Sequence, residues 1–126
     1  MISVNCGTDI IEIKRIKESI EDYGDSFLRK IFTEQEIEYC ESHKKMKYQH
    51  YAARFAAKEA VSKMFGTGFN GNFNWKDIEV LNSASGKPEV KLHDKALAMY
   101  ESEGYKNITI SISHCTEYAL CLVIGY

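Results

Sequence analysis

The sequence predicts a single α+β domain in which a mostly antiparallel sheet packs on one long central helix. Three observations favour this fold. Residues 49–68 are rich in alanine and have the composition of a helix. Alternating apolar segments within residues 77–92 and 107–124 are each interrupted by a short turn, which is typical of β-hairpins. At 126 residues the chain is long enough for one hydrophobic core but too short for two, so we expect one domain over residues 1–126.

The composition is typical of a compact globular protein. Apolar residues make up 44% of the chain, and no apolar run is as long as a membrane span. The N-terminus has no charged leader followed by a long apolar stretch, so we expect a cytoplasmic protein with no membrane partner. The formal charge of −2 argues against a nucleic-acid partner. The four cysteines occur singly, which favours reduced thiols over a metal site.

The N-terminal residues 1–13 alternate between apolar and polar side chains and predict a strand with a break or bulge at Gly7. Asp9 follows this break. Because an unpaired buried carboxylate is costly, a half-buried Asp9 needs a cation or hydrogen-bond donors. An exposed Asp9 at a sheet edge or in a turn is an equally good interpretation.

Residues 14–23 predict a short helix that Gly24 ends, and the apolar residues within 27–31 predict a further helical turn or two. Basic side chains recur throughout this segment, so one interpretation is a docking surface for an acidic partner. A solvated surface of mixed charge is the other interpretation, because acidic residues are interleaved with the basic ones.

A second helix start is predicted at Thr33, which has the spacing of a capping box with Glu36. This helix should continue to about His43. Residues 44–47, which include three lysines, are then expected to form a solvated loop that leads into the central helix.

The side chains of the central helix fall on three faces at a spacing of about 100° per residue. The broad apolar face should be core and contains Ala53, Ala56, Ala57, Ala60, Val61 and Met64. A second face carries Phe55, Glu59, Ser62 and Lys63. A third carries Arg54 and Lys58, and the helix ends at Gly66, Thr67 and Gly68. If this helix is buried, the polar side chains form a site.

The C-terminal half predicts two hairpins and one helix after a flexible loop at residues 69–75. The expected elements are strands at 77–81 and 87–92 joined by a turn at 82–86, a helix at 93–103 capped by Gly104, and strands at 107–113 and 118–124 joined by a reversal at 114–117.

Asp9 and Glu59 are the candidate ligands of a divalent metal, because two carboxylates together with waters and phosphate oxygens suit magnesium. The alternative for Glu59 is an ordinary helix ion pair with Lys63, four residues later. His114, at the expected hairpin tip, either donates to a phosphate or is simply exposed. The residues by themselves therefore predict a metal-assisted anion or phosphate site.

Five motifs occur together in this chain: GTDIIEIKRI at residues 7–16, FTEQE at 32–36, RFAAKEAVSKMFGTG at 54–68, DIEVLNSASGKPEV at 77–90 and SISHCTEYAL at 111–120. In this order and spacing the chain closely resembles the holo-acyl-carrier-protein synthase family of phosphopantetheinyl transferases. The resemblance implies the fold of that family. It also implies magnesium-dependent transfer of the 4′-phosphopantetheine arm of coenzyme A to a serine of apo acyl-carrier protein, which releases adenosine 3′,5′-bisphosphate and supports fatty acid biosynthesis.

The resemblance also implies roles for individual residues. Asp9 and Glu59 match the magnesium ligands and act with Lys63 in catalysis. The positions that line the phosphates and the nucleotide of coenzyme A are Arg54, Ser62, Lys63, Gly66, Thr67, Gly68 and His114. The candidate residues for docking the carrier protein are Arg15, Arg29 and Lys30. The short members of the family are homotrimers with sites between protomers, and the length of this chain predicts the same assembly.

Two other functions remain open at this stage. One is a catalytically silent module of the same fold that binds coenzyme A. The other is a magnesium-dependent phosphodiesterase that hydrolyses coenzyme A, with water in place of the serine.

Overall fold

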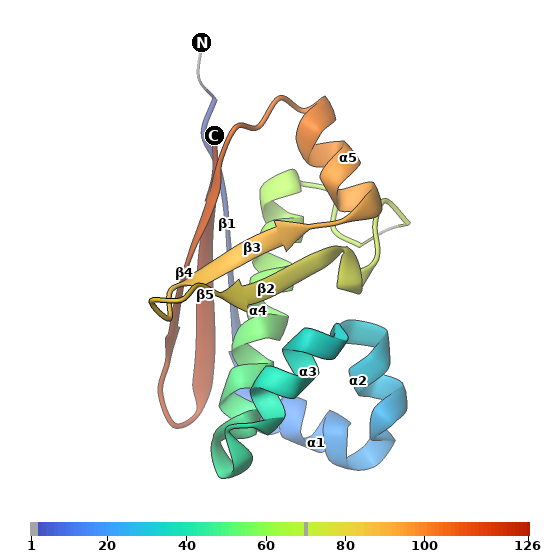
Figure 1. Ribbon diagram of the computed structural model, residues 1–126, viewed down its shortest axis with the longest axis vertical. Helices are drawn as coiled ribbons and strands as arrows, with labels where there is room; N and C mark the ends of the chain where they lie inside the picture. The colour runs from blue at the N-terminus through green and yellow to red at the C-terminus, as the bar shows by residue number, and fades with distance from the viewer. Residues whose placement is uncertain (1–2, 70) are drawn as a thin grey trace.

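The computed structural model describes residues 3–69 and 71–126. Helix α4 crosses the middle of the molecule, and the other elements surround it (Figure 1). The elements in chain order are β1 (Asn5–Glu12), α1 (Ile13–Tyr23), α2 (Asp25–Ile31), α3 (Glu34–Glu41), α4 (Lys47–Phe65), β2 (Ile78–Asn82), β3 (Pro88–Leu92), α5 (Asp94–Ser102), β4 (Ile108–His114) and β5 (Tyr118–Gly125). The predicted α+β fold with antiparallel strands around a long central helix is confirmed.

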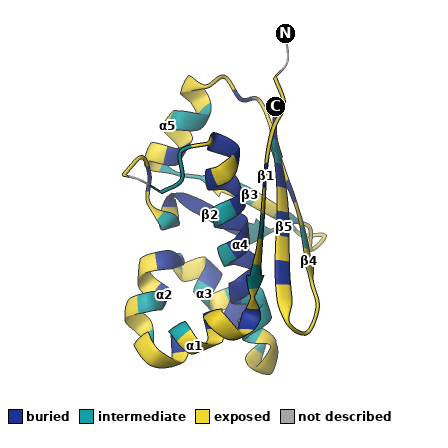
Figure 2. Ribbon diagram, turned by 180° about the vertical axis from the view of Figure 1, so that it is seen from behind, coloured by how far each residue is buried: buried dark blue, intermediate teal, exposed yellow. Residues whose placement is uncertain are grey.

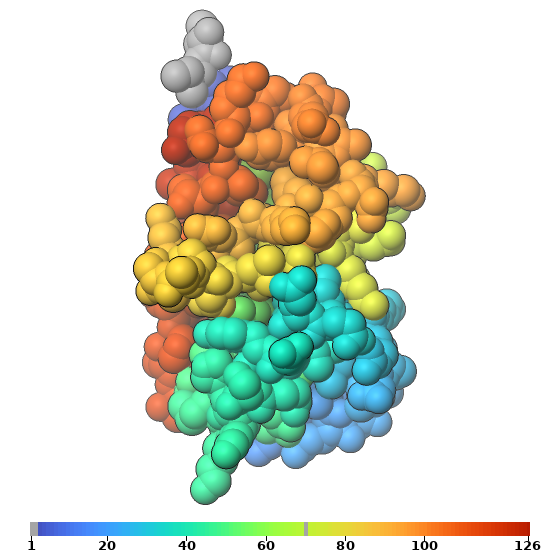
Figure 3. Space-filling model, in the orientation of Figure 1, coloured from blue at the N-terminus to red at the C-terminus, as the bar shows by residue number. Residues whose placement is uncertain are grey.

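The strands form two antiparallel sheets. The larger sheet has the order β1-β5-β4, and the smaller is the hairpin of β2 and β3. In Figure 3 this hairpin crosses the front of the molecule as a band between the helices α1–α3 and α5. Within the described residues, none of the helices is both long and apolar enough to span a bilayer.

Helix α4 is buried on nearly every side (Figure 2). Its C-terminal half packs with the strands and α5 in one hydrophobic cluster, and its N-terminal half packs with α1, α2 and α3 in a second. The predicted apolar face is buried, because the small alanine side chains let strands approach on one side and helices on the other. The single helix α4 therefore belongs to both parts of the core.

A buried ion pair joins α3, α4 and β2. Lys58 is completely buried, and its Nζ donates to Glu36 Oε1 at 2.8 Å and to the main-chain carbonyl of Ile78. The other carboxylate oxygen of Glu36 accepts from the main-chain N–H of Val80 at 2.9 Å. Glu36 also completes the predicted capping box with Thr33. Glu36 of the capping box is thus also the counter-charge of the buried Lys58. This ion pair fixes the hairpin against the helices.

The predicted bulge at Gly7 is wrong. Strand β1 begins at Asn5, later than predicted, and pairs with β5 without interruption, with Gly7 opposite Val123. Glycine is needed here for space, because a Cβ on Gly7 would lie 2.0 Å from the carbonyl oxygen of Ala60. The prediction for residues 1 and 2 lies outside the described residues.

The connection into α4 also differs from the prediction. Residues Lys44–Met46 form a single 3-10 turn, and Lys47 is already the first residue of α4. The Nζ of Lys47 lies 3.3 Å from Oε1 of Glu41 at the end of α3, so this ion pair spans the turn. Helix α4 therefore starts earlier than predicted. Its last residue is Phe65, and Gly66, the first residue of the predicted Gly66–Gly68 end, adopts a left-handed φ of 81°.

Candidate active site

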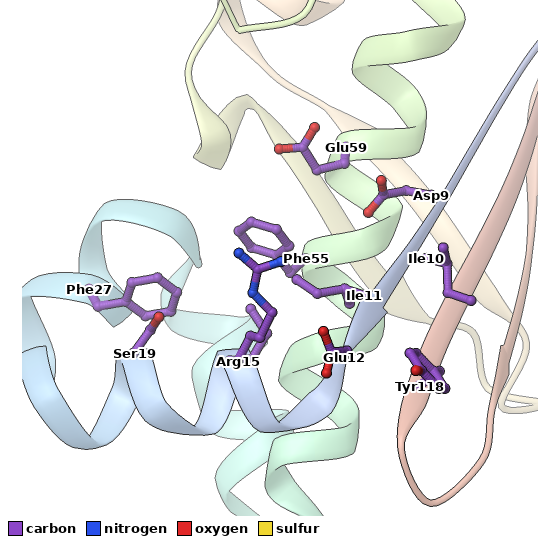
Figure 4. A pocket seen from close by; sticks show the side chains of 11 residues that line it. Asp9, Ile10, Ile11, Glu12, Arg15, Ser19, Phe27, Phe55, Glu59 and Tyr118 are labelled. Carbon is purple, nitrogen blue, oxygen red and sulfur yellow. The ribbon is translucent and has the colours of Figure 1, made fainter.

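Asp9 of β1 and Glu59 of α4 face the same pocket (Figure 4). Side chains alternate across a strand, so Asp9 points to the same side of β1 as Gly7, toward α4. The pocket has a volume of about 540 Å³ and is lined by Asp9, Ile10, Ile11, Glu12, Arg15, Ile16, Ser19, Phe27, Phe55, Glu59 and Tyr118. The close contact of β1 with α4 therefore brings together two carboxylates that are far apart in the sequence.

Lys63 lies beside the pocket and contacts one of these two carboxylates. Lys63 Nζ lies 3.1 Å from Asp9 Oδ1 and also donates to the main-chain carbonyl of Thr8 at 3.1 Å. Lys63 thus pairs with Asp9 across the two elements, in place of the helix ion pair with Glu59 that its spacing allows. Burial, followed by the nearby Asp9 carboxylate, raises the pKa of Glu59, while Lys63 lowers it. A further positive charge bound in this pocket would favour the ionised form of Glu59.

The donor set of this pocket fits magnesium. Across residues 3–69 and 71–126, no three or more side chains of His, Cys, Asp or Glu form a group that could hold a metal. Magnesium does not require such a group, because it commonly binds one or two carboxylates together with waters and substrate phosphates. Asp9 and Glu59 supply those two carboxylates, and a bound divalent cation would offset the burial and the repulsion by Asp9 that raise the pKa of Glu59.

The wall of the pocket beside the carboxylates is largely apolar. Phe27 and Phe55 line it, and the ring of Phe55 stacks on Trp75 with 5.0 Å between the ring centres. Arg15 of α1 also lines the pocket, as Figure 4 shows. The pocket can therefore hold an anionic group at one end and a less polar chain at the other.

The remaining candidate docking residues lie outside this pocket. Arg29 and Lys30 are exposed on α2 and do not line it. Arg29 forms an ion pair with Glu34 at the start of α3, which also raises the pKa of its guanidinium. Of the three candidate docking residues, the structure brings only Arg15 to the carboxylates.

Ser62 and the Gly66–Gly68 segment have structural partners. The Ser62 side chain is buried, and its hydroxyl donates to the carbonyl of Glu59 at 2.7 Å within α4. The N–H groups of Gly66 and Gly68 bond to carbonyls of the last helical turn, and Thr67 lies between these two glycines. These residues end α4 just beyond Lys63, and they are not among those lining the pocket of Asp9 and Glu59.

Arg54 and His114 form a second group, separate from the carboxylates. Arg54 is 4% exposed, and its Nη2 donates to Asn82 Oδ1 at 2.7 Å. It lines a different hollow, which shares no residue with the pocket of Asp9 and Glu59. The ring of His114, at the end of β4, lies 6.4 Å from that of His50. The residues of the predicted site thus lie in two separate places in the fold.

Sequence reasoning missed two members of this second group. His50 of α4 contacts His43, with 3.8 Å between the ring centres, and both rings lie against Tyr39 of α3. The only signal in the sequence is a histidine on either side of the connection between α3 and α4. Neither periodicity nor a motif relates them to His114, because the fold alone brings the end of β4 beside α4.

Comparisons with known proteins point to one family. The family model of the 4′-phosphopantetheinyl transferase superfamily matches residues 5–123. The holo-[acyl-carrier-protein] synthase of Ruminiclostridium cellulolyticum is 55% identical over 118 residues, which is 94% of this chain and 88% of the relative. That of Solibacter usitatus is 46% identical over 121 residues, 96% of each chain.

Two solved structures show the same fold. The crystal structure of the Neisseria meningitidis holo-[acyl-carrier-protein] synthase is 31% identical to this chain, covers 97% of both chains and has a TM-score of 0.88. The Helicobacter pylori enzyme, crystallised in complex with coenzyme A, is 27% identical, with a TM-score of 0.85 over 96% of this chain and 99% of that one.

Proposed function

Because the chain belongs to the 4′-phosphopantetheinyl transferase superfamily and is a holo-[acyl-carrier-protein] synthase, we propose that it transfers phosphopantetheine from coenzyme A in a magnesium-dependent reaction. The acceptor is a serine of an apo acyl-carrier protein, and the second product is adenosine 3′,5′-bisphosphate. The holo carrier protein then serves fatty acid biosynthesis in the cytoplasm. The observation that carries this proposal is the pair of carboxylates, Asp9 and Glu59, that face one pocket beside Lys63.

The residues of the pocket account for the parts of this reaction. Magnesium held by Asp9 and Glu59 would neutralise charge on the pyrophosphate of coenzyme A. Lys63 adds a positive charge beside Asp9, where it stabilises the phosphoryl group under attack. Glu59 accepts the proton of the serine hydroxyl, directly or through a water, because its carboxylate faces the pocket that the serine must reach. Alignment of the serine with the phosphoryl group contributes much of the rate.

The test is the intact mass of an apo acyl-carrier protein incubated with the enzyme, coenzyme A and magnesium, with and without a chelator. A gain of one phosphopantetheine that the chelator prevents supports the proposal. Free phosphopantetheine with an unchanged carrier protein indicates hydrolysis of coenzyme A. Coenzyme A binding without either product indicates a silent binding module of the same fold.

The assembly we propose is a homotrimer with sites between protomers. The outer face of the larger sheet is apolar and exposed, with Ile10 at 62% and Leu122 at 42% exposure. Ile10 and Tyr118 also line the pocket of Asp9 and Glu59, so a chain covering this face would reach the pocket. The separation of Arg54 and His114 from the carboxylates supports the same assembly, because a neighbour can supply the group that one chain lacks at each site.

Leu122→Glu is expected to dissociate the trimer into monomers, since it places a charge on the apolar face that the neighbour would cover. The rate of phosphopantetheine transfer should also fall, because each site would lose the group of residues that the neighbouring chain supplies. The measurement is the mass in solution by light scattering, with phosphopantetheine transfer followed in parallel. The matched control is Leu97→Glu on α5, whose leucine is 40% exposed but lies away from this sheet. An unchanged mass for Leu122→Glu contradicts the assignment of this face.

Arg15→Glu is expected to raise KM for the carrier protein by about tenfold, because Arg15 stands beside the carboxylates that the serine must reach. Lys14→Glu makes the same charge change on the same helix, but Lys14 is exposed and does not line the pocket. Equal effects of the two variants would mean that only the net charge of α1 matters.

A further inference from the structure

Four rings from three parts of the fold form a cluster beside Arg54: Tyr39 of α3, His43 just after α3, His50 of α4 and His114 at the end of β4. The ring centre of Tyr39 lies 4.6 Å from that of His43 and 5.5 Å from that of His50. His43 and His50 are 3.8 Å apart, and His114 is 6.4 Å from His50. We call these four residues the histidine cluster.

Arg54 packs beside the cluster and has one N–H group without a hydrogen-bond acceptor in the described part of the chain. Its guanidinium carbon lies 4.2 Å from the centre of the Tyr39 ring. One nitrogen donates to Asn82, but the buried Nε has no hydrogen-bond partner among the described residues. An unpaired buried donor on a cation is costly, which favours an anionic acceptor at this place.

The charged and titratable groups that face His50 are bases on every side. They are His43 from the end of α3, Arg54 from α4 and His114 from β4, and the ring of Tyr39 packs against His43 and His50. Burial and these three bases lower the pKa of His50 to about 4. At neutral pH His50 is therefore uncharged. An anion bound among these groups would raise the pKa of His50 and favour its protonated form.

We propose that His43 and His50 couple the binding of coenzyme A to proton uptake, with the pair taking a proton from solvent when a phosphate monoester binds beside Arg54. This inference rests on the proposed function. The pyrophosphate of coenzyme A is assigned to the metal pocket, so the 3′-phosphate is the remaining anion. Its two negative charges at neutral pH complement a guanidinium together with one imidazolium.

The pH dependence follows from the direction of this change. His50 is uncharged in the free protein at neutral pH, whereas the bound cluster holds one proton more, so affinity for coenzyme A rises as pH falls through the pKa of the bound state. Titration of the phosphate itself has the opposite sign. Its second pKa is about 6, and binding to cations shifts it toward the dianion, which releases protons. Net proton uptake therefore identifies the histidines as its source.

The experiment is calorimetric titration at neutral pH in two buffers that differ in heat of ionisation, with coenzyme A and with 3′-dephospho-coenzyme A. We expect proton uptake with coenzyme A and none with the dephospho form. His50→Gln should abolish the uptake and weaken coenzyme A binding by about tenfold. It should leave binding of the dephospho form unchanged, and His43→Asn should act in the same direction.

The control variant is His93→Gln, whose histidine lies outside the cluster and contacts Glu79 at 2.9 Å. It should retain the proton uptake. Uptake that persists in both His50→Gln and His43→Asn, or that is equal for the two ligands, overturns the proposal. Failure of the proposed function is a separate result, because it appears as an unmodified carrier protein whatever the proton balance of coenzyme A binding.

Discussion

Asp9→Asn and Glu59→Gln, made singly, are expected to lower kcat for phosphopantetheine transfer by at least about 1,000-fold, because each removes one of the two charges that would hold magnesium against the pyrophosphate. The amides have nearly the same shape as the carboxylates. Packing between β1 and α4 should therefore persist. For Glu59→Gln the fold should be no less stable than the original, since burial and Asp9 already disfavour the ionised carboxylate in the folded protein.

Three measurements separate loss of the metal site from loss of the fold. Transfer is followed by the mass of the carrier protein, magnesium binding by calorimetry in the presence of coenzyme A, and folding by thermal denaturation. Glu89→Gln, which removes an exposed carboxylate on β3, is the matched control and should leave all three unchanged. Near-normal transfer by either site variant would remove the assignment of Asp9 and Glu59 as metal ligands.

The features that the sequence predicted well depend on neighbours along the chain. The alanine face of α4 follows from helical periodicity, and the capping box of Thr33 and Glu36 follows from a spacing of three residues. Both are local patterns that the rest of the fold does not alter. The second role of Glu36, as the partner of the buried Lys58, is a contact between distant residues and has no local pattern.

The parts of the site that the sequence missed depend on contacts between distant segments. His43 and His50 meet because a 3-10 turn reverses the chain between α3 and α4, and His114 joins them only through the sheet. The resemblance places Arg54 and His114 in one site with Asp9, yet in a single chain they lie in separate groups. A sequence does not state which residues share a site, and in the proposed trimer a neighbouring chain would supply the second group.

Gly7 is the clearest case in which the reason for a residue lies outside its own segment. The pattern of strand, glycine and strand fits a bulge, and a left-handed backbone is the usual reason for glycine. Neither applies here, because β1 is regular at Gly7 and its φ lies outside the left-handed range. The glycine is required because the backbone of α4 passes directly over it.

Gly7→Ala is accordingly expected to destabilise the protein by more than about 4 kcal/mol, a range that single substitutions reach only through severe mechanisms. The added Cβ would lie 2.0 Å from the carbonyl oxygen of Ala60 and 2.7 Å from the main-chain nitrogen of Met64. Both are backbone atoms of a buried helix, so no side-chain rotation relieves the contact. The strand and the helix must move apart, which opens the core along α4.

Gly125→Ala is the matched control for this prediction. Its added Cβ would lie 2.5 Å from the Met64 sulfur and 2.9 Å from the Tyr105 ring, and both belong to side chains, of which the methionine can rotate away. Urea denaturation should show a much smaller loss for Gly125→Ala than for Gly7→Ala, and equal losses would contradict the steric argument. Any Gly7→Ala protein that still folds should transfer phosphopantetheine poorly, because separation of β1 from α4 also separates Asp9 from Glu59.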